Sequence, residues 1–101
     1  MSRLESPRPI VYDQKLFVLP ANQTDYDVKT NQSSLFDNVP LAKNIVIFFD
    51  ASITIRFNNT LMPAAILPIS RSPFQSPSRF LDISNIFLTN TTAVNVEVWL
   101  W

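Results

Sequence analysis

The sequence contains neither cysteine nor histidine. Without cysteine it has no disulfide framework, no thiolate nucleophile and no zinc site of the thiolate type. Without histidine it lacks the commonest general base and metal ligand, and a Ser-His-Asp relay is excluded. The acidic residues are scattered, so a hydrolase that uses two carboxylates is left only as a remote alternative. The sequence therefore predicts a protein that is not an enzyme and that needs no cofactor.

Glycine is absent as well, whereas its average usage in proteins is about 7%. A phosphate-binding loop and a dinucleotide fingerprint are excluded, because both need glycine where the backbone closely approaches a phosphate. Turns are expected to use Asn, Asp, Ser and Pro instead, since Asn and Asp tolerate the left-handed region. The predicted turn positions are Asn22, Asp37-Asn38, Asp50, Asn58-Asn59 and Asn90.

The chain also lacks the apolar segments of targeted or membrane-spanning proteins. Residues 1–10 do not contain the apolar region of a signal peptide, and no apolar run approaches the roughly 18 residues of a membrane span. We therefore expect synthesis in the cytoplasm and no membrane partner. The Asn-X-Ser/Thr sequons are interpreted as turn residues rather than glycan sites, and they begin at Asn22, Asn31, Asn58 and Asn90.

No charge of one sign predominates: 8 Lys and Arg residues balance 8 Asp and Glu residues. A nucleic-acid partner is not expected, because phosphate binding normally needs a basic field. Near-neutrality suits a protein that packs against copies of itself or against a partner. Asp25 and Asp27, with Asp13 or Asp37, are candidate calcium ligands, but spaced acids without an EF-hand loop are usually solvated. No metal is expected.

What the chain does contain is a series of short apolar runs with the periodicity of β-strands. In the central stretch 44–58, two such runs flank the link Asp50-Ala51-Ser52, which predicts a β-hairpin. The first run has no polar side, so we expect it to be covered on both sides, by a second sheet and by something else such as another subunit. Further strands are expected within 10–18, 25–30, 65–69, 79–89 and 93–101.

Seven or eight short strands with no credible helix predict an all-β fold. We expect a single antiparallel β-sandwich, jelly-roll-like or Ig-like, over residues 21–101. Residues 1–20 are expected to be an extended N-terminal arm with prolines at positions 7 and 9, either frayed or lying across a neighbouring subunit. The predicted core comprises Ile45, Ile47, Phe49, Ile53, Ile55, Phe57, Ile83, Ile86, Leu88, Val94, Val96 and Val98.

The clearest alternation lies at 93–101, where the valines and Leu100 form one face and Trp99 and Trp101 belong to the other. Outward tryptophans are costly on a monomer and are enriched among interface hot spots. The alternatives are that a loop of the same subunit covers them, or that they form a platform on which sugars stack. The predicted interface comprises Ile10, Val11, Tyr12, Val46, Phe48, Trp99 and Trp101.

The succession SITIRFN (52–58), SPF (72–74), LDISNIFLTN (81–90) and VNVEVWLW (94–101) resembles small all-β virion proteins of tailed bacteriophages. The resemblance is a pattern of strands and turns over about 44–101, and it supplies no site residues. It implies a capsid decoration or cement subunit, located in the virion, that forms a trimer or another homo-oligomer. Such a subunit would dock on the major capsid protein or another virion protein. The alternative is a tail, connector or fibre accessory module that binds a host-surface glycan or receptor.

Overall fold

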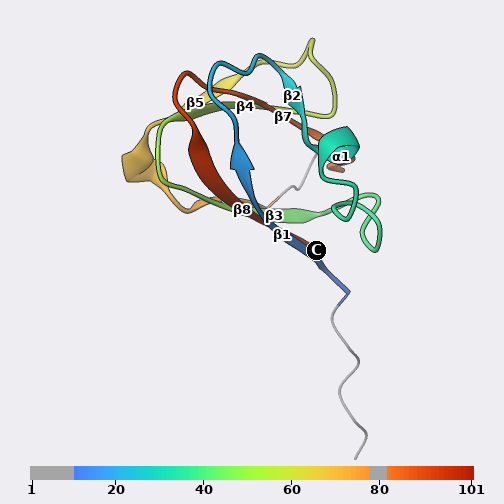
Figure 1. Cartoon of the computed structure of the whole chain (residues 1–101). Coiled ribbons are helices and arrows are strands. Elements are labelled where there is room, and N and C mark those ends of the chain that lie inside the picture. The colour runs from blue at the N-terminus through green and yellow to red at the C-terminus, as the bar shows by residue number, and fades with distance from the viewer. Residues whose placement is uncertain (1–10, 78–81) are drawn as a thin grey trace, which may run out of the picture.

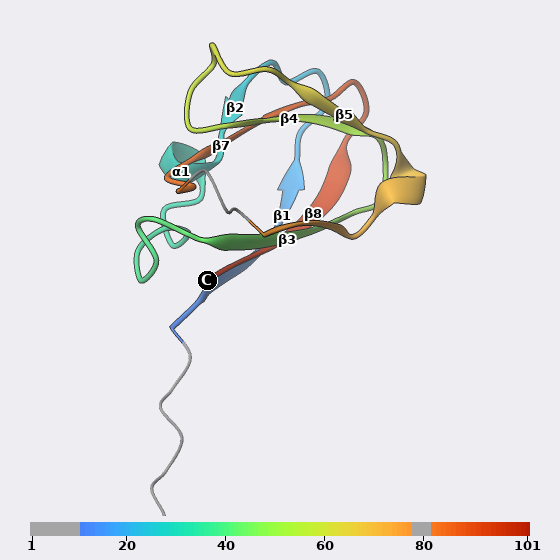
Figure 2. The ribbon, with the colours of Figure 1, turned by 180° about the vertical axis from the view of Figure 1, so that it is seen from behind.

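The computed structural model describes residues 11–77 and 82–101 (Figure 1). Their strands are β1 Asp13–Leu19, β2 Tyr26–Asp27, β3 Asn44–Phe49, β4 Ile53–Phe57, β5 Ala65–Leu67, β6 Phe74–Pro77, β7 Ile86–Thr89 and β8 Val94–Leu100. Within these residues the strands form two antiparallel four-stranded sheets, the β8 sheet (order β1-β8-β3-β6) and the β7 sheet (order β2-β7-β4-β5). Figure 2 shows them as two layers, with β4, β5 and β7 in one and β1, β3 and β8 in the other. The predicted all-β class is confirmed.

The central stretch 44–58 does not form a hairpin, so this prediction is wrong. β3 pairs with β8 in one sheet, whereas β4 pairs with β5 and β7 in the other. A tight hairpin turn needs positive φ angles, and no residue of the link 50–52 has one. Instead, the Asp50 carboxylate accepts hydrogen bonds from the backbone nitrogen (2.8 Å) and the side-chain amide (2.7 Å) of Asn95. The link therefore carries the chain between sheets, and the apolar sides of both strands face one core.

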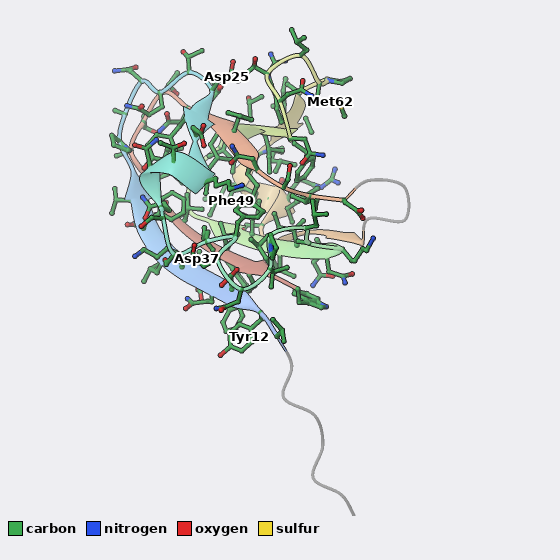
Figure 3. All side chains as sticks on the ribbon, turned by 90° about the vertical axis from the view of Figure 1, so that its right-hand side faces the viewer. Tyr12, Asp25, Asp37, Phe49 and Met62 are labelled. Carbon is green, nitrogen blue, oxygen red and sulfur yellow. The ribbon has the colours of Figure 1, made fainter. Side chains whose placement is uncertain are left out.

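The core lies between the two sheets and contains the predicted residues, with Phe57 only partly buried. The segment between β2 and β3 adds buried side chains that the sequence analysis did not include. They are Val28, Leu35, Phe36, Val39 and Ala42. This segment has no strand periodicity, because most of it is irregular backbone that closes one end of the layer pair. Phe49, labelled in Figure 3, belongs to the same core.

Positive φ angles are most readily adopted by glycine, but in the described chain other residue types adopt them. They occur at Asn22 (61°), Asp25 (49°), Phe36 (68°) and Asn58 (71°). Asn22 and Asn58 are among the predicted turn positions. Asn90, another of them, is buried, and its side-chain amide donates to the carbonyl oxygens of Pro20 and Thr92, both at 2.8 Å. The sequon asparagines Asn22, Asn58 and Asn90 thus act in loops, as expected, whereas Asn31 is the last residue of the short helix Val28–Asn31.

Two short helical segments depart from the prediction that helices are absent: α1 (Val28–Asn31) and a 3-10 turn, η1 (Ile69–Arg71). The strand expected over 25–30 is correspondingly limited to β2. It ends there because the Asp27 carboxylate accepts a hydrogen bond from the Thr30 backbone nitrogen (3.0 Å) and so caps α1. Of the strand region expected within 79–89, β7 occupies the last part, and residues 78–81 lie outside the described residues.

The boundary predicted at residue 20, between the N-terminal arm and the sandwich, does not match the start of the β8 sheet. Residues 13–19, which were assigned to the arm, form β1 and pair with β8 along the whole length of β1. Phe17 and Leu19 of this strand are buried in the core, which explains why the segment is held in the sheet. Residues 1–10 lie outside the described residues.

Candidate functional site

The outer sides of the two sheets differ in chemistry. The alternation of β8 and β3 turns most of the aliphatic side chains inward and leaves a mixture of apolar and polar side chains outward. We use the name apolar face for the apolar members of the outward set on the β8 sheet, which are Tyr12, Leu16, Val18, Val46, Phe48, Trp99 and Trp101. The polar residues Gln14, Asn95 and Glu97 lie among them. The outward positions of the β7 sheet are more polar, and they are Asp27, Thr54, Arg56, Ile66, Phe87 and Thr89.

A groove runs over β8 and β3 in the middle of the apolar face. Strand pairing sets Trp99 opposite Val46 and Glu97 opposite Phe48. Together with Trp101, these four side chains line an open groove of about 450 Å³, which we call the aromatic groove. Phe48 is 42% exposed and Trp101 is 43% exposed. The outer side of β3 is therefore not covered by the described part of the chain.

Tyr12 lies at the edge of the aromatic groove and contacts Trp99. Their ring centroids are 5.5 Å apart, and the ring planes are inclined by 25°, a stacked arrangement. Figure 3 shows Tyr12 at the end of the molecule where the described chain begins. The stack leaves Trp99 half-buried. Trp99 is thus partly covered by its own subunit, through the Tyr12 ring next to β1 and not through a loop, while Trp101 remains 43% exposed.

Glu97 is the charged residue of the aromatic groove. Its Oε2 atom accepts hydrogen bonds from the Trp99 indole nitrogen at 2.9 Å and from the Gln14 side-chain amide at 3.1 Å. The ion pairs of the described chain lie elsewhere, and none involves Glu97. The groove therefore combines flat apolar walls with one oriented carboxylate, a pairing that suits an apolar ligand carrying a cation or a hydrogen-bond donor.

The structure gathers most of the predicted interface in one place. Val46, Phe48, Trp99 and Trp101 line the aromatic groove, and Tyr12 stacks at its edge. The remaining two predicted residues differ: Val11, beside Tyr12, is 61% exposed, and Ile10 lies outside the described residues.

Two exposed residues of the apolar face were not predicted, Leu16 and Val18 of β1, which are 66% and 58% exposed. Their signal in the sequence is the alternation of β1. It is obscured because the polar Asp13 and Lys15 occupy inward positions of the same strand. Glu97 was not predicted as part of the site, because its place beside Trp99 and Phe48 depends on the strand register.

The acids considered as calcium ligands are used separately. Asp13 is buried and accepts hydrogen bonds from the backbone nitrogens of Asn38 (3.0 Å) and Val39 (2.9 Å). Asp25 pairs with Arg56 at 3.2 Å, and Figure 3 shows it far from Asp37. Over residues 11–77 and 82–101, no group of three or more His, Cys, Asp or Glu side chains is placed to hold a metal ion.

Asp27 shows how hydrogen bonding compensates for burial at one of these acids. Burial raises its pKa, but hydrogen bonds from the Asn85 side chain and from Thr30 outweigh that effect. The pKa of the Asp27 carboxyl is therefore held below its ordinary value. The carboxylate acts as a helix cap and a link to β7, which is a structural role.

Comparison of the chain with protein-family models, with curated proteins and with solved structures finds no match. In the described ranges, no helix is long and apolar enough to cross a membrane.

Proposed function

We propose that this chain is a non-enzymatic structural subunit that associates with copies of itself and docks on a larger assembly through the apolar face. The observation that carries the proposal is the concentration of exposed apolar side chains on one sheet, including Leu16 (66%), Val18 (58%) and Phe48 (42%). Contiguous exposed apolar surface on a small protein marks an interaction site. The aromatic side chains at its centre have the character of interface anchors.

The size of the hydrophobic effect supports association through this face. Fully burying a Leu, Val or Phe side chain contributes roughly 1.5–3 kcal/mol. Association costs an estimated 4–15 kcal/mol in lost translational and rotational freedom. Leu16, Val18 and Phe48 are 66%, 58% and 42% exposed, so burying what remains of their surface contributes roughly 2.5–5 kcal/mol in total. This sum reaches only the lower end of that range, and the two tryptophans add the surplus that a stable contact needs. The absence of net charge removes long-range repulsion between copies.

The specific form that we propose is a capsid decoration or cement subunit of a phage-type virion. It rests on the resemblance of 44–101 to small all-β virion proteins and on the small two-sheet fold with one adhesive face. In this proposal the sheets form a sandwich of the jelly-roll or Ig type. The subunit assembles as a trimer or another homo-oligomer, is made in the host cytoplasm, and binds the major capsid protein or another virion protein.

Light scattering of the purified chain over a range of concentrations tests the proposed self-association. We expect an oligomer for the unmodified chain and loss of the oligomer in Phe48→Ser, because the substitution removes a central anchor of the apolar face. Ile66→Ser is the matched control, since Ile66 is 78% exposed on the β7 sheet. A monomer at every concentration would contradict self-association, and an equal effect of both substitutions would contradict the choice of face.

The second candidate is a binding module for a host-surface glycan or receptor, and the composition of the aromatic groove favours it. Flat aromatic rings such as Trp99 stack on sugars, and a neighbouring carboxylate accepts hydrogen bonds from hydroxyl groups. The outward amide of Asn95 donates to Asp50, so Glu97 is the polar partner beside Trp99. A glycan array separates the candidates, because a cement subunit shows no sugar preference.

A further inference from the structure

We propose that the aromatic groove of one copy binds residues 1–10 of a second copy, with Arg8 of that segment paired to Glu97. This inference rests on the proposed self-association and names the surfaces that carry it. It follows from three independent features: the lining of the groove, the residue pattern of the segment, and the place where the described chain begins.

The groove has the chemistry of a site for a proline-containing extended segment. Its walls are Trp99, Trp101, Phe48 and Val46, and Tyr12 flanks it. Grooves lined by aromatic side chains bind polyproline II segments, which lie on the flat rings and lose little entropy on binding.

The Glu97 carboxylate makes some apolar occupants of the groove more favourable than others. Both hydrogen bonds to Glu97 come from neutral donors and reach the same oxygen, Oε2. A face-to-face contact centred on this groove would bring two Glu97 carboxylates together, and like charges in an interface are unfavourable. An occupant with a cation next to its apolar side chains avoids this repulsion and pairs the carboxylate.

The sequence of residues 1–10, MSRLESPRPI, matches these requirements. Pro7 and Pro9 fix their own φ angles and bias the residue before each of them toward extended backbone. A polyproline II helix has three residues per turn, so Leu4, Pro7 and Ile10 share one side of such a segment. In that conformation these three would form an apolar ridge of about 19 Å at 3.1 Å per residue. Arg8 would occupy the adjacent edge, where a guanidinium can pair with a carboxylate beside the ridge.

The start of the described chain indicates that the acceptor is a second copy. β1 runs antiparallel to β8 with Asp13 opposite Leu100, so the described residues before it, Val11 and Tyr12, lead past the end of β8. Figure 1 shows the start of β1 next to the C-terminus, at one end of the molecule. To lie in its own groove the chain would have to reverse immediately before Val11. A neighbouring molecule receives the segment without this reversal.

A charge exchange between two variants of the full chain tests the pairing. In an assembly of Arg8→Glu alone, two acidic side chains meet at positions 8 and 97. In an assembly of Glu97→Arg alone, two arginines meet there. We expect each variant alone to show a dissociation constant at least about tenfold above that of the unmodified chain. An equimolar mixture restores association, because a segment of one variant finds a groove of opposite charge in the other variant. The recovery is complete in an assembly with an even number of copies, whereas a mixed trimer keeps one unfavourable contact. Arg3→Glu is the matched control, since it changes the charge of the segment equally on a different edge.

The outcomes separate this inference from the proposed function. Recovery of the oligomer mass on mixing, by light scattering, supports exchange between copies, because a contact within one chain cannot be restored by mixing. An oligomer that both variants leave intact overturns the inference and leaves self-association standing. A monomeric unmodified chain overturns both. Arg8→Glu also gives a separate test, which does not depend on the folding of the Glu97 variant because position 8 precedes the first described strand. If Arg8→Glu and Arg3→Glu weaken association equally, the pairing of Arg8 with Glu97 is overturned.

Discussion

The indole nitrogen of Trp99 donates a hydrogen bond of 2.9 Å to Oε2 of Glu97, two residues away on the same outward side of β8. This contact orients both residues at the centre of the apolar face. Tyr12 then covers one side of the indole ring, with 5.5 Å between ring centroids. An aromatic side chain that is held by a hydrogen bond and a stack loses less freedom when a partner binds. The face is therefore pre-organised around Trp99.

The first prediction concerns the Tyr12–Trp99 stack. Tyr12→Ala is expected to lower the free energy of unfolding by about 1 kcal/mol, because a stacked aromatic pair contributes roughly 0.5–1.5 kcal/mol beyond its buried area. Tyr12→Phe keeps the ring and should change stability little. Urea unfolding followed by tryptophan fluorescence measures both. An unfolding free energy that is the same for Tyr12→Ala and the unmodified chain would show that the stack does not stabilise the fold.

The second prediction concerns the buried carboxylate of Asp13. Asp13→Ala is expected to cost about 2–3 kcal/mol, because the backbone nitrogens of Asn38 and Val39 lose their acceptor. Asp37→Ala is the matched control, since Asp37 is a neighbouring exposed acid. Denaturant midpoints of the two variants at pH 7 make the comparison. Equal midpoints would mean that the loop at 38–39 does not depend on Asp13.

The sequence predicted the inward and outward residues of β8 and β3 correctly, because side-chain alternation is a local property of a strand. It did not predict that β3 and β4 lie in different sheets, since two apolar runs joined by a short link look alike as a hairpin and as a crossing between layers. The partners that separate β3 from β4 are distant in the sequence: β3 pairs with β8, β4 pairs with β5 and β7, and Asp50 between them binds Asn95. Non-local hydrogen bonds of this kind leave no local pattern.

The same distinction applies to the candidate site. The outward positions of Trp99, Trp101, Val46 and Phe48 follow from alternation, but their convergence on one groove depends on the register between β3 and β8. The role of Glu97 was missed for this reason. In the irregular segment between β2 and β3, buried residues such as Leu35 and Phe36 lack any period that marks them as core.

The third prediction concerns Asn58, which has a φ angle of 71°. Its Oδ1 atom accepts a hydrogen bond from the Ser84 backbone nitrogen (2.8 Å), and its amide donates to the Asp82 carbonyl oxygen (2.8 Å). Both Asn58→Ala and Asn58→Gly lose these contacts, but only alanine has a side chain that disfavours a positive φ angle. We therefore expect Asn58→Ala to be less stable than Asn58→Gly by about 1 kcal/mol in thermal or urea unfolding. Equal stabilities would contradict the backbone explanation.

The fourth prediction concerns the dependence of stability on pH at the link between the sheets. Hydrogen bonds from the Asn95 side chain and backbone hold the pKa of the Asp50 carboxyl below its ordinary range. In the unfolded chain this carboxyl titrates at about pH 3.9. Because the folded state binds its proton less readily, Asp50 stabilises the fold above that pH. The contribution is lost as pH falls through the lower, folded pKa.

Asp50→Asn separates this contribution from those of the other carboxyls, including Asp27, whose pKa is also lowered. The variant is expected to be less stable than the unmodified chain at pH 7, because a neutral amide accepts hydrogen bonds more weakly than a carboxylate. The difference should begin to shrink as pH falls below about 4, where Asp50 of the unfolded chain becomes protonated, and it should vanish below the lower pKa of the folded state. Urea unfolding of both chains at several pH values between 7 and 2.5 measures it. A difference that stays constant over this range would show that the link between the sheets does not depend on the charge of Asp50.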